Sequence, residues 1–192
     1  MSNSITNILL VGVGGQGILL ASEILSEAAM LAGFDVKKSE IHGMSQRGGS
    51  VVSHVRYGTE VFSPIVPEGE GDILFGFELM ETFRSLPLLK PHGTVVANDL
   101  KISPPSVLMG QESYPSGLSE KIKREFDDFL LLDGQKLASD AGNVKTANTV
   151  LLGAVSKRLN ISEEFWMNAL EKMVPAKALE VNKKAFRLGR EL

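Results

Sequence analysis

The chain has 192 residues, 43% of them hydrophobic and 22% charged, and a net charge of −3, an ordinary composition for a soluble globular protein. It contains no cysteine, which excludes disulfides, thiolate zinc sites, a cysteine nucleophile and cysteine-ligated iron–sulfur clusters from this chain. The three histidines lack metal-site spacing, the apolar runs are shorter than the ~20 residues that span a bilayer, and the N-terminus lacks signal-peptide features. We therefore expect a cytoplasmic protein with one domain over residues 1–192 and no metal ligands of its own.

Short apolar runs alternate with helical patterns along the chain. Residues 7–11 form an apolar run closed by glycine, which is typical of a buried parallel strand. Residues 16–31 have the periodicity of a helix, and Gly33 follows where a C-terminal cap belongs. Further strands are predicted over residues 34–39, 51–57, 73–77, 94–97 and 129–132, and further helices over residues 78–88, 119–126, 144–159, 163–173 and 177–190.

This alternation predicts an α/β fold with a Rossmann-like, mostly parallel sheet flanked by helices and joined by right-handed crossovers. Pro91 and Gly93 predict a turn before the strand at 94–97, and the proline-containing segment 101–118 predicts a loop. The chain ends in a run of predicted helices, which we expect to cover one face or an edge of the sheet.

The first glycine motif reads Gly-Val-Gly-Gly-Gln-Gly and occupies residues 12–17, between the first predicted strand and helix. It matches the G-x-G-x-x-G turn of dinucleotide-binding proteins. In that turn Gly12 permits the tight bend, Gly14 lets backbone approach a phosphate, and Gly17 allows close packing of helix on strand. The helix N-terminus behind it adds free N–H groups and the positive end of the helix dipole. The candidate cofactor-binding residues of this motif are Gly12, Gly14, Gly15, Gln16 and Gly17.

Other interpretations of this turn stay open at the level of sequence. A lone G-x-G-x-x-G can simply pack a helix tightly against a strand. Binding of NAD or FAD also requires an acidic residue at the end of the second strand, whereas Asp35 falls at that strand's start and Glu40 just past its predicted end. The turn is not followed by Lys-Ser or Lys-Thr, which argues against a P-loop NTPase.

A second glycine motif, SEIHGMSQRGGS, occupies residues 39–50. The guanidinium of Arg47 can bind a phosphate or carboxylate through two parallel hydrogen bonds, and Gln46 adds an amide beside it. Gly48 and Gly49 can adopt positive φ angles and expose their N–H groups as an anion-binding nest. The alternative, equally open, is a turn into the next strand with Arg47 in a structural ion pair.

The two motifs together carry a resemblance to a known family. The stretches NILLVGVGGQGILLASEILSEAAMLAG, SEIHGMSQRGGSVVSHVRYG and DILFGFELMETFRSLPLLKPHGTVVAND resemble the small subunit, of beta or gamma type, of 2-oxoacid:ferredoxin oxidoreductases. The resemblance covers residues 5–190. It is closest to the indolepyruvate:ferredoxin oxidoreductase beta subunit because residues 40–49 read EIHGMSQRGG, where pyruvate and 2-oxoglutarate relatives are expected to read nearer Gly-Pro-Glu-x-Arg-Gly-Gly.

The resemblance implies a thiamine-diphosphate-dependent enzyme that oxidatively decarboxylates indolepyruvate or another aryl pyruvate to an acyl-CoA, with ferredoxin as electron acceptor. It places the thiamine diphosphate and the 4Fe-4S clusters in a large partner subunit, in agreement with the absence of cysteine here. This chain is then a required subunit, not catalytic alone, that assembles with the large subunit and helps to cover the coenzyme A site. We expect no nucleic-acid partner, because the basic excess of residues 176–192 is small and shows no pattern of interleaved aromatic residues, and no membrane partner.

The three histidines have separate expected roles. His42, beside the second glycine motif, either reaches the thiamine site across a subunit interface or orders its own loop. His54 is expected on the more polar side of a strand, and His92 in an exposed turn.

Acidic and amide side chains near strand ends are further candidates. Asp99 and Asp133 each follow a predicted strand, where they would either face a ligand crevice or cap a turn. Within the segment 140–148, Asp140 or Asn143 is expected to cap a helix. Two alternative functions stay open: a free-standing NAD- or FAD-dependent oxidoreductase, and an interaction module in which both glycine motifs are structural.

Overall fold

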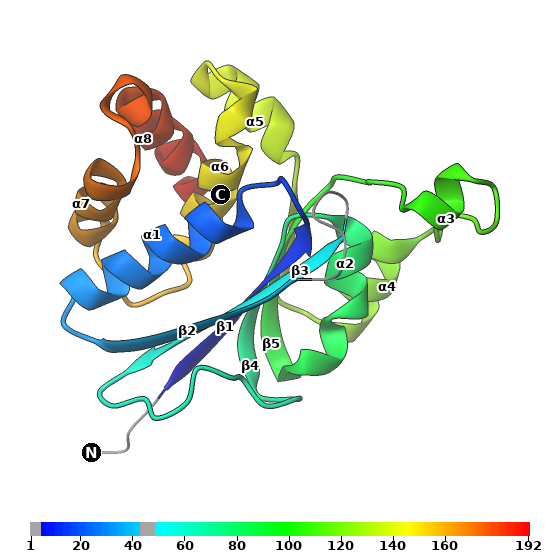
Figure 1. Ribbon diagram of the computed structural model, residues 1–192, viewed down its shortest axis with the longest axis horizontal. Helices are drawn as coiled ribbons and strands as arrows, with labels where there is room; N and C mark the ends of the chain where they lie inside the picture. Colours follow the sequence, from blue (N-terminus) through cyan, green and yellow to red (C-terminus); the bar gives the residue numbers. More distant parts are fainter. Residues whose placement is uncertain (1–4, 43–48) are drawn as a thin grey trace.

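The structure is a computed structural model that describes residues 5–42 and 49–192. For His42 it describes only the backbone. The described residues form a six-stranded sheet with helices on both faces (Figure 1). The strand order is β2-β3-β1-β4-β5-β6, with β1, β4, β5 and β6 parallel and β3 antiparallel to both of its neighbours. The prediction of a mostly parallel α/β sheet is confirmed. The strands are β1 (Thr6–Val13), β2 (Asp35–His42), β3 (Ser50–Gly58), β4 (Gly71–Gly76), β5 (Leu89–Asn98) and β6 (Phe129–Leu132).

The helices divide between the two faces of this sheet. One layer combines α1 with the C-terminal helices, and the opposite layer holds α2 and α4 (Figure 1). No helix of the described ranges is long and apolar enough to cross a membrane. The helices are α1 (Ile18–Leu31), α2 (Leu79–Arg84), α3 (Pro105–Leu108), α4 (Leu118–Glu125), α5 (Gly134–Ala141), α6 (Ala147–Ser156), α7 (Glu163–Met173) and α8 (Ala176–Arg190), with 3-10 turns η1 (Leu86–Leu88) and η2 (Val144–Thr146).

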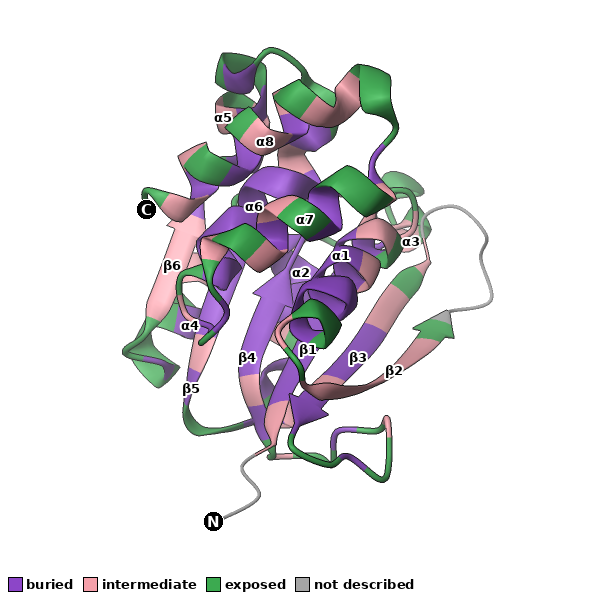
Figure 2. Cartoon of the chain, turned by 90° about the vertical axis from the view of Figure 1, so that its left-hand side faces the viewer, coloured by how far each residue is buried: buried purple, intermediate pink, exposed green. Residues whose placement is uncertain are grey.

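Alternation along β1 explains why the sheet is covered on both faces. Ile8 and Leu10 belong to the core beneath α1 and α6–α8, whereas Leu9 and Val11 belong to the core beneath α2 and α4. Successive side chains of a strand point to opposite faces, so an unbroken apolar run needs a partner layer on each side. Figure 2 shows the buried residues concentrated in the central strands and on the inner sides of the helices.

The C-terminal helices cover one face of the sheet, as predicted, and two glycines set their spacing. A Cβ atom added to Gly153 would stand 2.0 Å from the Phe186 carbonyl oxygen, and one added to Gly189 would stand 1.8 Å from the Val150 carbonyl oxygen. These distances are far inside van der Waals contact, so α6 and α8 approach this closely because both positions lack a side chain.

Several details of the secondary-structure prediction are wrong. Helix α5 was not predicted, and the single helix predicted over 78–88 is divided into α2 and η1. The predicted loop 101–118 contains the short helix α3, and the helix predicted over 144–159 consists of η2 followed by α6. Pro91 and Gly93 lie inside β5 and not in a turn before it. The β4–β5 register shifts between Gly71 and Ile73, and His92, which lies between Pro91 and Gly93, has a φ of 64°. Pro91 and Gly93 are therefore accommodated by an irregularity within the strand.

His54 lies on the more polar side of β3, as expected, which it shares with Ser50 and Arg56. It is nevertheless buried, at 5% exposure, and its Nδ1 accepts a hydrogen bond from the Val66 N–H at 3.1 Å. Burial, with a further contribution from the nearby Arg56 charge, lowers the pKa of the imidazole below its ordinary value. The neutral ring therefore holds the β3–β4 loop, whereas His92 is exposed as expected.

We predict that His54 makes the protein less stable in mild acid. Because its pKa is lower in the folded than in the unfolded chain, its contribution is present above the unfolded pKa of about 6.5 and is lost as the pH falls through the folded value. His54→Gln should reduce the pH dependence of the unfolding free energy below pH 6.5 by up to about 1.4 kcal/mol per pH unit, measured by urea denaturation. His92→Gln, at the exposed histidine, should keep the wild-type dependence; an unchanged slope in His54→Gln would contradict the assignment.

Candidate functional site

The carboxyl ends of the four parallel strands meet at one edge of the sheet. From β1 the chain crosses through α1 to β2 on one side, while β4 lies on the other side of β1. In open α/β sheets such a reversal opens a crevice beyond the carboxyl ends of the strands, where ligands bind. The first glycine motif is the β1–α1 connection and therefore lies at this position.

The glycines of this turn are required for different structural reasons. Gly15 and Gly17 have φ angles of 98° and 79°, which favour glycine. A Cβ on Gly17 would stand 2.7 Å from the Asn148 side-chain nitrogen, and one on Gly12 would stand 2.6 Å from Gln16 Oε1. Gly12 and Gly17 thus make room for protein atoms, whereas beside Gly15 no heavy atom of the described residues lies within 4 Å of an added Cβ.

The Gln16 side chain bridges the crevice between β1 and β4. Its Oε1 accepts from the Val13 N–H at 2.7 Å, and its Nε2 donates to the Phe77 carbonyl at 2.8 Å. Phe77 follows β4 directly, and its own N–H donates to the Val11 carbonyl at 2.8 Å. The carboxamide thus ties the glycine turn to the end of the neighbouring strand.

Asn98 continues these contacts to the other two parallel strands. Its Nδ2 donates to the same Phe77 carbonyl at 3.3 Å and to Gln135 Oε1 at 3.2 Å, and its Oδ1 accepts from the Gly134 N–H at 2.9 Å. Gln16, the Phe77 carbonyl, Asn98 and the Gly134 N–H form what we call the carboxyl-edge row. It links the segments that follow β1, β4 and β6 with the end of β5.

This geometry does not favour a dinucleotide in the crevice. The Gln16 carboxamide lies between the β1 turn and the end of β4, where the pyrophosphate of NAD or FAD would be expected. Glu40, the candidate for a ribose contact, lies within β2 and not past its end. It accepts from Lys38 Nζ at 2.9 Å and from Ser22 Oγ at 3.3 Å.

The second glycine motif meets the first. The Gly14 N–H donates to the Gly49 carbonyl at 3.0 Å, so the two motifs are joined by a backbone hydrogen bond. Gln46, Arg47 and Gly48 lie outside the described residues. The contact between Gly14 and Gly49 brings together the two candidate stretches that the sequence places 35 residues apart.

Glu78 is a buried carboxylate at the same edge that the sequence analysis did not select. Its Oε2 accepts from the Glu81 N–H at 2.8 Å and caps α2; its Oε1 accepts from the Ile102 N–H at 3.1 Å and the Tyr114 hydroxyl at 2.6 Å. Burial and the hydrogen bond to Glu78 raise the pKa of the Tyr114 phenol above its ordinary value. An acidic residue directly after a predicted strand was the available signal for the cap, but its partners come from a loop that sequence patterns do not place.

The remaining polar candidates act mostly as caps. Asp133 caps α5 by accepting from the Lys136 N–H at 2.9 Å, and Asn143 caps η2 by accepting from the Lys145 N–H at 3.0 Å. Asp140 lies within α5, and Asp99 is exposed after β5. The described residues contain no group of three or more histidine, aspartate or glutamate side chains placed to hold a metal ion.

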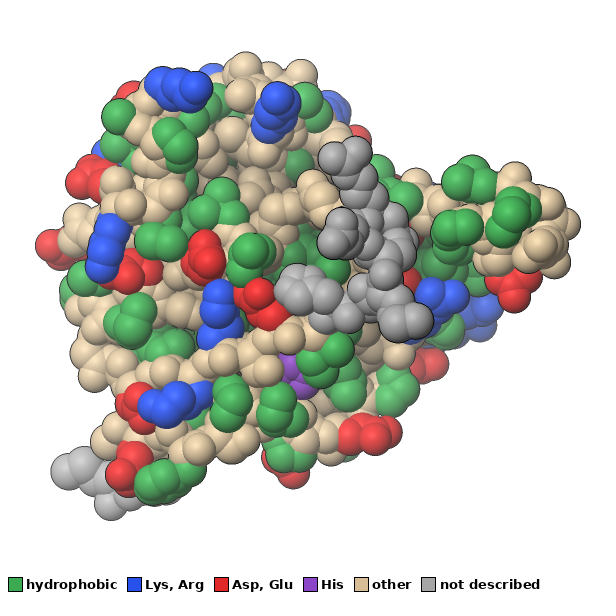
Figure 3. All heavy atoms as spheres, viewed as in Figure 1, with side chains coloured by type: hydrophobic (Ala, Val, Ile, Leu, Met, Phe, Trp, Pro, Cys, Tyr) green, Lys and Arg blue, Asp and Glu red, His purple; other side chains and the backbone are tan. Residues whose placement is uncertain are grey.

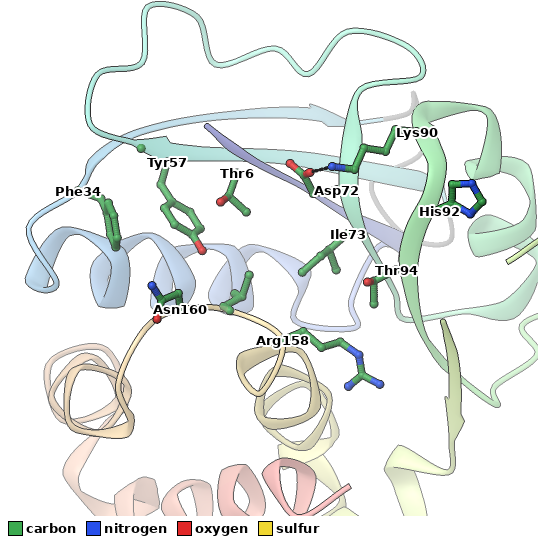
Figure 4. A pocket seen from close by; sticks show the side chains of 12 residues that line it. Thr6, Phe34, Tyr57, Asp72, Ile73, Lys90, His92, Thr94, Arg158 and Asn160 are labelled. Atoms are coloured by element: carbon green, nitrogen blue, oxygen red, sulfur yellow. Dashed lines mark hydrogen bonds and ion pairs between the residues drawn. The ribbon is translucent and has the colours of Figure 1, made fainter. Parts of the chain in front are cut away.

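A cavity of about 440 Å³ lies at the opposite, amino edge of the sheet (Figure 4). Tyr57 points toward it from β3, and its pKa is raised, chiefly by burial. The charged residues around it are paired, Asp72 with Lys90 and Arg158 with Asp128. This cavity is separate from both glycine motifs, which lie at the carboxyl edge.

Comparison with known proteins agrees with this architecture. The family model described as pyruvate ferredoxin/flavodoxin oxidoreductase matches residues 7–192. The chain belongs to this family. Family members named "Indolepyruvate oxidoreductase subunit IorB" are 46% identical in Pyrococcus horikoshii and 44% identical in Thermococcus kodakarensis, each over 95% of this chain and 93% of the relative. The resemblance to small subunits of 2-oxoacid:ferredoxin oxidoreductases is confirmed.

Solved structures show the same fold in this oxidoreductase family. The gamma subunit of a keto/oxoacid ferredoxin oxidoreductase from Geobacter sulfurreducens has a TM-score of 0.71 and 26% identity, with 97% of this chain and 96% of that one covered. A 2-oxoglutarate:ferredoxin oxidoreductase from Magnetococcus marinus has a TM-score of 0.76 at 20% identity, with 99% of this chain matched to 31% of that chain. The fold of this chain therefore occurs both as a separate subunit and as one part of a longer polypeptide.

We predict that the carboxyl-edge row depends on the donor nitrogen of Gln16. In Gln16→Glu a carboxylate oxygen would face the Phe77 carbonyl, and the unfolding free energy should fall by about 1–3 kcal/mol, measured by urea denaturation at pH 7. Gln135→Glu is the matched control because Gln135 uses its oxygen as an acceptor, which glutamate retains. Equal stability of the two variants would show that the Gln16–Phe77 hydrogen bond contributes nothing.

We also predict that Glu78 holds the loop that follows β5. Glu78→Gln replaces one accepting oxygen with a donor, so the unfolding free energy should fall by about 1.5–3 kcal/mol. Chymotrypsin should cleave between residues 99 and 117 faster than in the wild type, as followed by mass spectrometry. Glu125→Gln, on the exposed end of α4, should leave both measurements unchanged; unaltered cleavage in Glu78→Gln would refute this role.

Proposed function

We propose that this chain is the small subunit of a thiamine-diphosphate-dependent 2-oxoacid:ferredoxin oxidoreductase acting on indolepyruvate or a related aryl pyruvate. The observation that carries the proposal is the 46% identity to a protein named as an indolepyruvate oxidoreductase subunit, over 95% of this chain. The complex would convert the 2-oxoacid and coenzyme A into carbon dioxide and an acyl-CoA, with two electrons passed to ferredoxin.

The chain's own part in this reaction is assembly and binding, not chemistry. With no cysteine, it offers no thiolates for iron–sulfur clusters, which are assigned with the thiamine diphosphate to the large partner subunit. The partners proposed are this large subunit and, for the whole complex, ferredoxin. Among the described residues, the side chains of Gln16, Asn98 and Glu78 at the carboxyl edge are engaged in hydrogen bonds that hold the fold together.

The proposed contact with coenzyme A lies where the two glycine motifs meet. Gly12, Gln16 and Gly17 are committed to packing, so a pyrophosphate would face the outer side of the turn at Gly14 and Gly15. The neighbouring stretch Gln46, Arg47, Gly48 and Gly49 supplies one permanent cation and backbone N–H groups suited to phosphate oxygens. The hydrogen bond from Gly14 to Gly49 supports treating the two stretches as one surface.

The proposal predicts that Arg47 affects coenzyme A and not the oxoacid. The chain is copurified anaerobically with its large subunit and assayed for indolepyruvate- and coenzyme A-dependent reduction of a viologen dye. Arg47→Ala should raise the KM for coenzyme A about tenfold, as expected for the loss of one charge-assisted phosphate contact, and leave the KM for indolepyruvate within about twofold. Arg124→Ala, an exposed arginine on α4, should change neither value.

The possible results separate the functions considered. An unchanged KM for coenzyme A in Arg47→Ala would remove the proposed contact. A wild-type complex without coenzyme A-dependent oxidation of any aryl pyruvate would remove the substrate assignment. Stoichiometric NAD or FAD in the purified chain would instead favour the free-standing oxidoreductase.

A further inference from the structure

The tip of one projecting segment of the chain has no role in the two cores or in the proposed coenzyme A contact. Residues 99–117 connect β5 to α4 and include α3. This segment, which we call the α3 arm, extends beyond α2 and α4, away from the body of the molecule (Figure 1). Every residue of the arm is at least partly exposed. Nineteen residues therefore leave the body while contributing no fully buried side chain to its cores.

The tip of the arm presents apolar side chains to solvent. Leu108 is 75% exposed and Met109 is 65% exposed. Figure 3 shows hydrophobic side chains gathered on the projecting arm. The sequence from Ile102 to Leu118 contains no lysine or arginine and one acidic residue, Glu112. A large apolar tip almost without charge is typical of a surface that is covered by another protein.

The arm is ordered by its own contacts. Within the tip, the Leu108 N–H donates to the Pro104 carbonyl at 3.0 Å and the Met109 N–H donates to the Pro105 carbonyl at 2.9 Å. Ser106 Oγ donates to Glu112 Oε2 at 2.8 Å. These bonds and the adjacent prolines pre-form the tip, which lowers the entropic cost of inserting it into a partner.

The root of the arm is attached to the candidate site. Glu78 accepts from Ile102 and Tyr114 at the two sides of the root, and the Leu79 N–H donates to the Leu100 carbonyl at 2.9 Å. The residue before Glu78 is Phe77, whose carbonyl accepts from Gln16 of the glycine turn. A partner that holds the tip is therefore connected through two consecutive residues to the carboxyl edge.

We propose that the α3 arm inserts Leu108 and Met109 into an apolar groove of the large subunit of the same enzyme. The occupant follows from the family comparison, in which a chain containing this fold is about three times longer, so that the fold is built together with further protein. Under the proposed function that further protein is the separate large subunit, and the arm is an exposed apolar projection that can meet it. The inference rests on the proposed function for the existence of this partner.

The first test is oxidation of methionine in the free chain and in the complex. Met109 and Met30 are both exposed, at 65% and 50%, and Met30 lies near the end of α1, toward the amino edge of the sheet. Hydrogen peroxide converts accessible methionine to the sulfoxide, which mass spectrometry quantifies for each residue. Binding should slow oxidation of Met109 at least about fivefold while Met30 reacts at an unchanged rate, because the partner covers only the first of them. Equal oxidation of Met109 in the free chain and the complex overturns the proposal.

The second test uses substitutions with a matched control. Leu108→Asp combined with Met109→Asp should weaken binding to the large subunit at least about tenfold, because two apolar side chains lose their burial. Phe62→Asp, at an 82% exposed side chain in the β3–β4 loop of the opposite edge, should change binding less than about twofold. The free double variant should keep the wild-type unfolding midpoint, since neither side chain contributes to the cores.

The remaining outcomes are also decisive. If the double variant binds as tightly as the wild type, the tip is not the docking element. If the wild-type chain forms a dimer that the double variant abolishes, the arm joins two copies of this chain and the proposal is wrong. If the wild-type chain does not bind a large subunit, both this inference and the proposed function are wrong. If it forms a tight complex that does not oxidise the oxoacid, only the substrate assignment is wrong, and the proposed docking by the arm is unaffected.

Discussion

The carbonyl oxygen of Phe77 is the point on which the carboxyl edge of this sheet depends. Gln16 and Asn98 both donate to it, one from the β1–α1 turn and one from the end of β5. Backbone ladders hold parallel strands along their length, but they end where the strands end, and the groups beyond need side-chain partners. The carboxyl-edge row supplies such partners, and in doing so it joins the segments that follow β1, β4 and β6 to the end of β5.

The next residue, Glu78, is a buried carboxylate that connects this edge to the projecting arm. Its carboxylate is fully buried and has no cation among the partners found for it; backbone N–H groups and the Tyr114 hydroxyl solvate it instead. A buried charge solvated in this way is costly to disturb, because loss of one donor leaves the carboxylate incompletely satisfied. The chain thus attaches its projecting arm at Glu78, directly after the carbonyl that receives the hydrogen bonds of Gln16 and Asn98.

The sequence predicted the layers of this protein better than the contacts at its edge. Apolar runs predicted the central parallel strands, because strands buried on both faces must be apolar on both, as the two cores around β1 show. The antiparallel β3 was predicted from alternating side chains instead, and the predicted strand 34–39, the start of β2, has no such apolar run. Helix α5 was missed because its eight residues include few apolar ones, and the irregular part of β5 was read as a turn because Pro91 and Gly93 are typical of turns. The hydrogen bond between Gln16 and Phe77 joins positions that are 61 residues apart in the sequence, and the one between Tyr114 and Glu78 joins positions that are 36 residues apart. No local sequence pattern relates positions at such separations.

The glycine turn illustrates why one motif supports two different interpretations. G-x-G-x-x-G specifies a backbone path, in which positive φ angles and missing Cβ atoms let a helix start close to a strand. Whether the space so created receives a phosphate or a protein group depends on the residues between the glycines. Here the position before the last glycine is Gln16, whose carboxamide is long enough to reach both Val13 and Phe77. Gly12 is then required by Gln16 itself and Gly17 by Asn148, whereas beside Gly15 no heavy atom of the described residues lies within 4 Å of an added Cβ. Ligand contacts in such a turn therefore have to be assigned residue by residue, because the glycines that match the motif best can be the ones that the protein's own side chains already occupy.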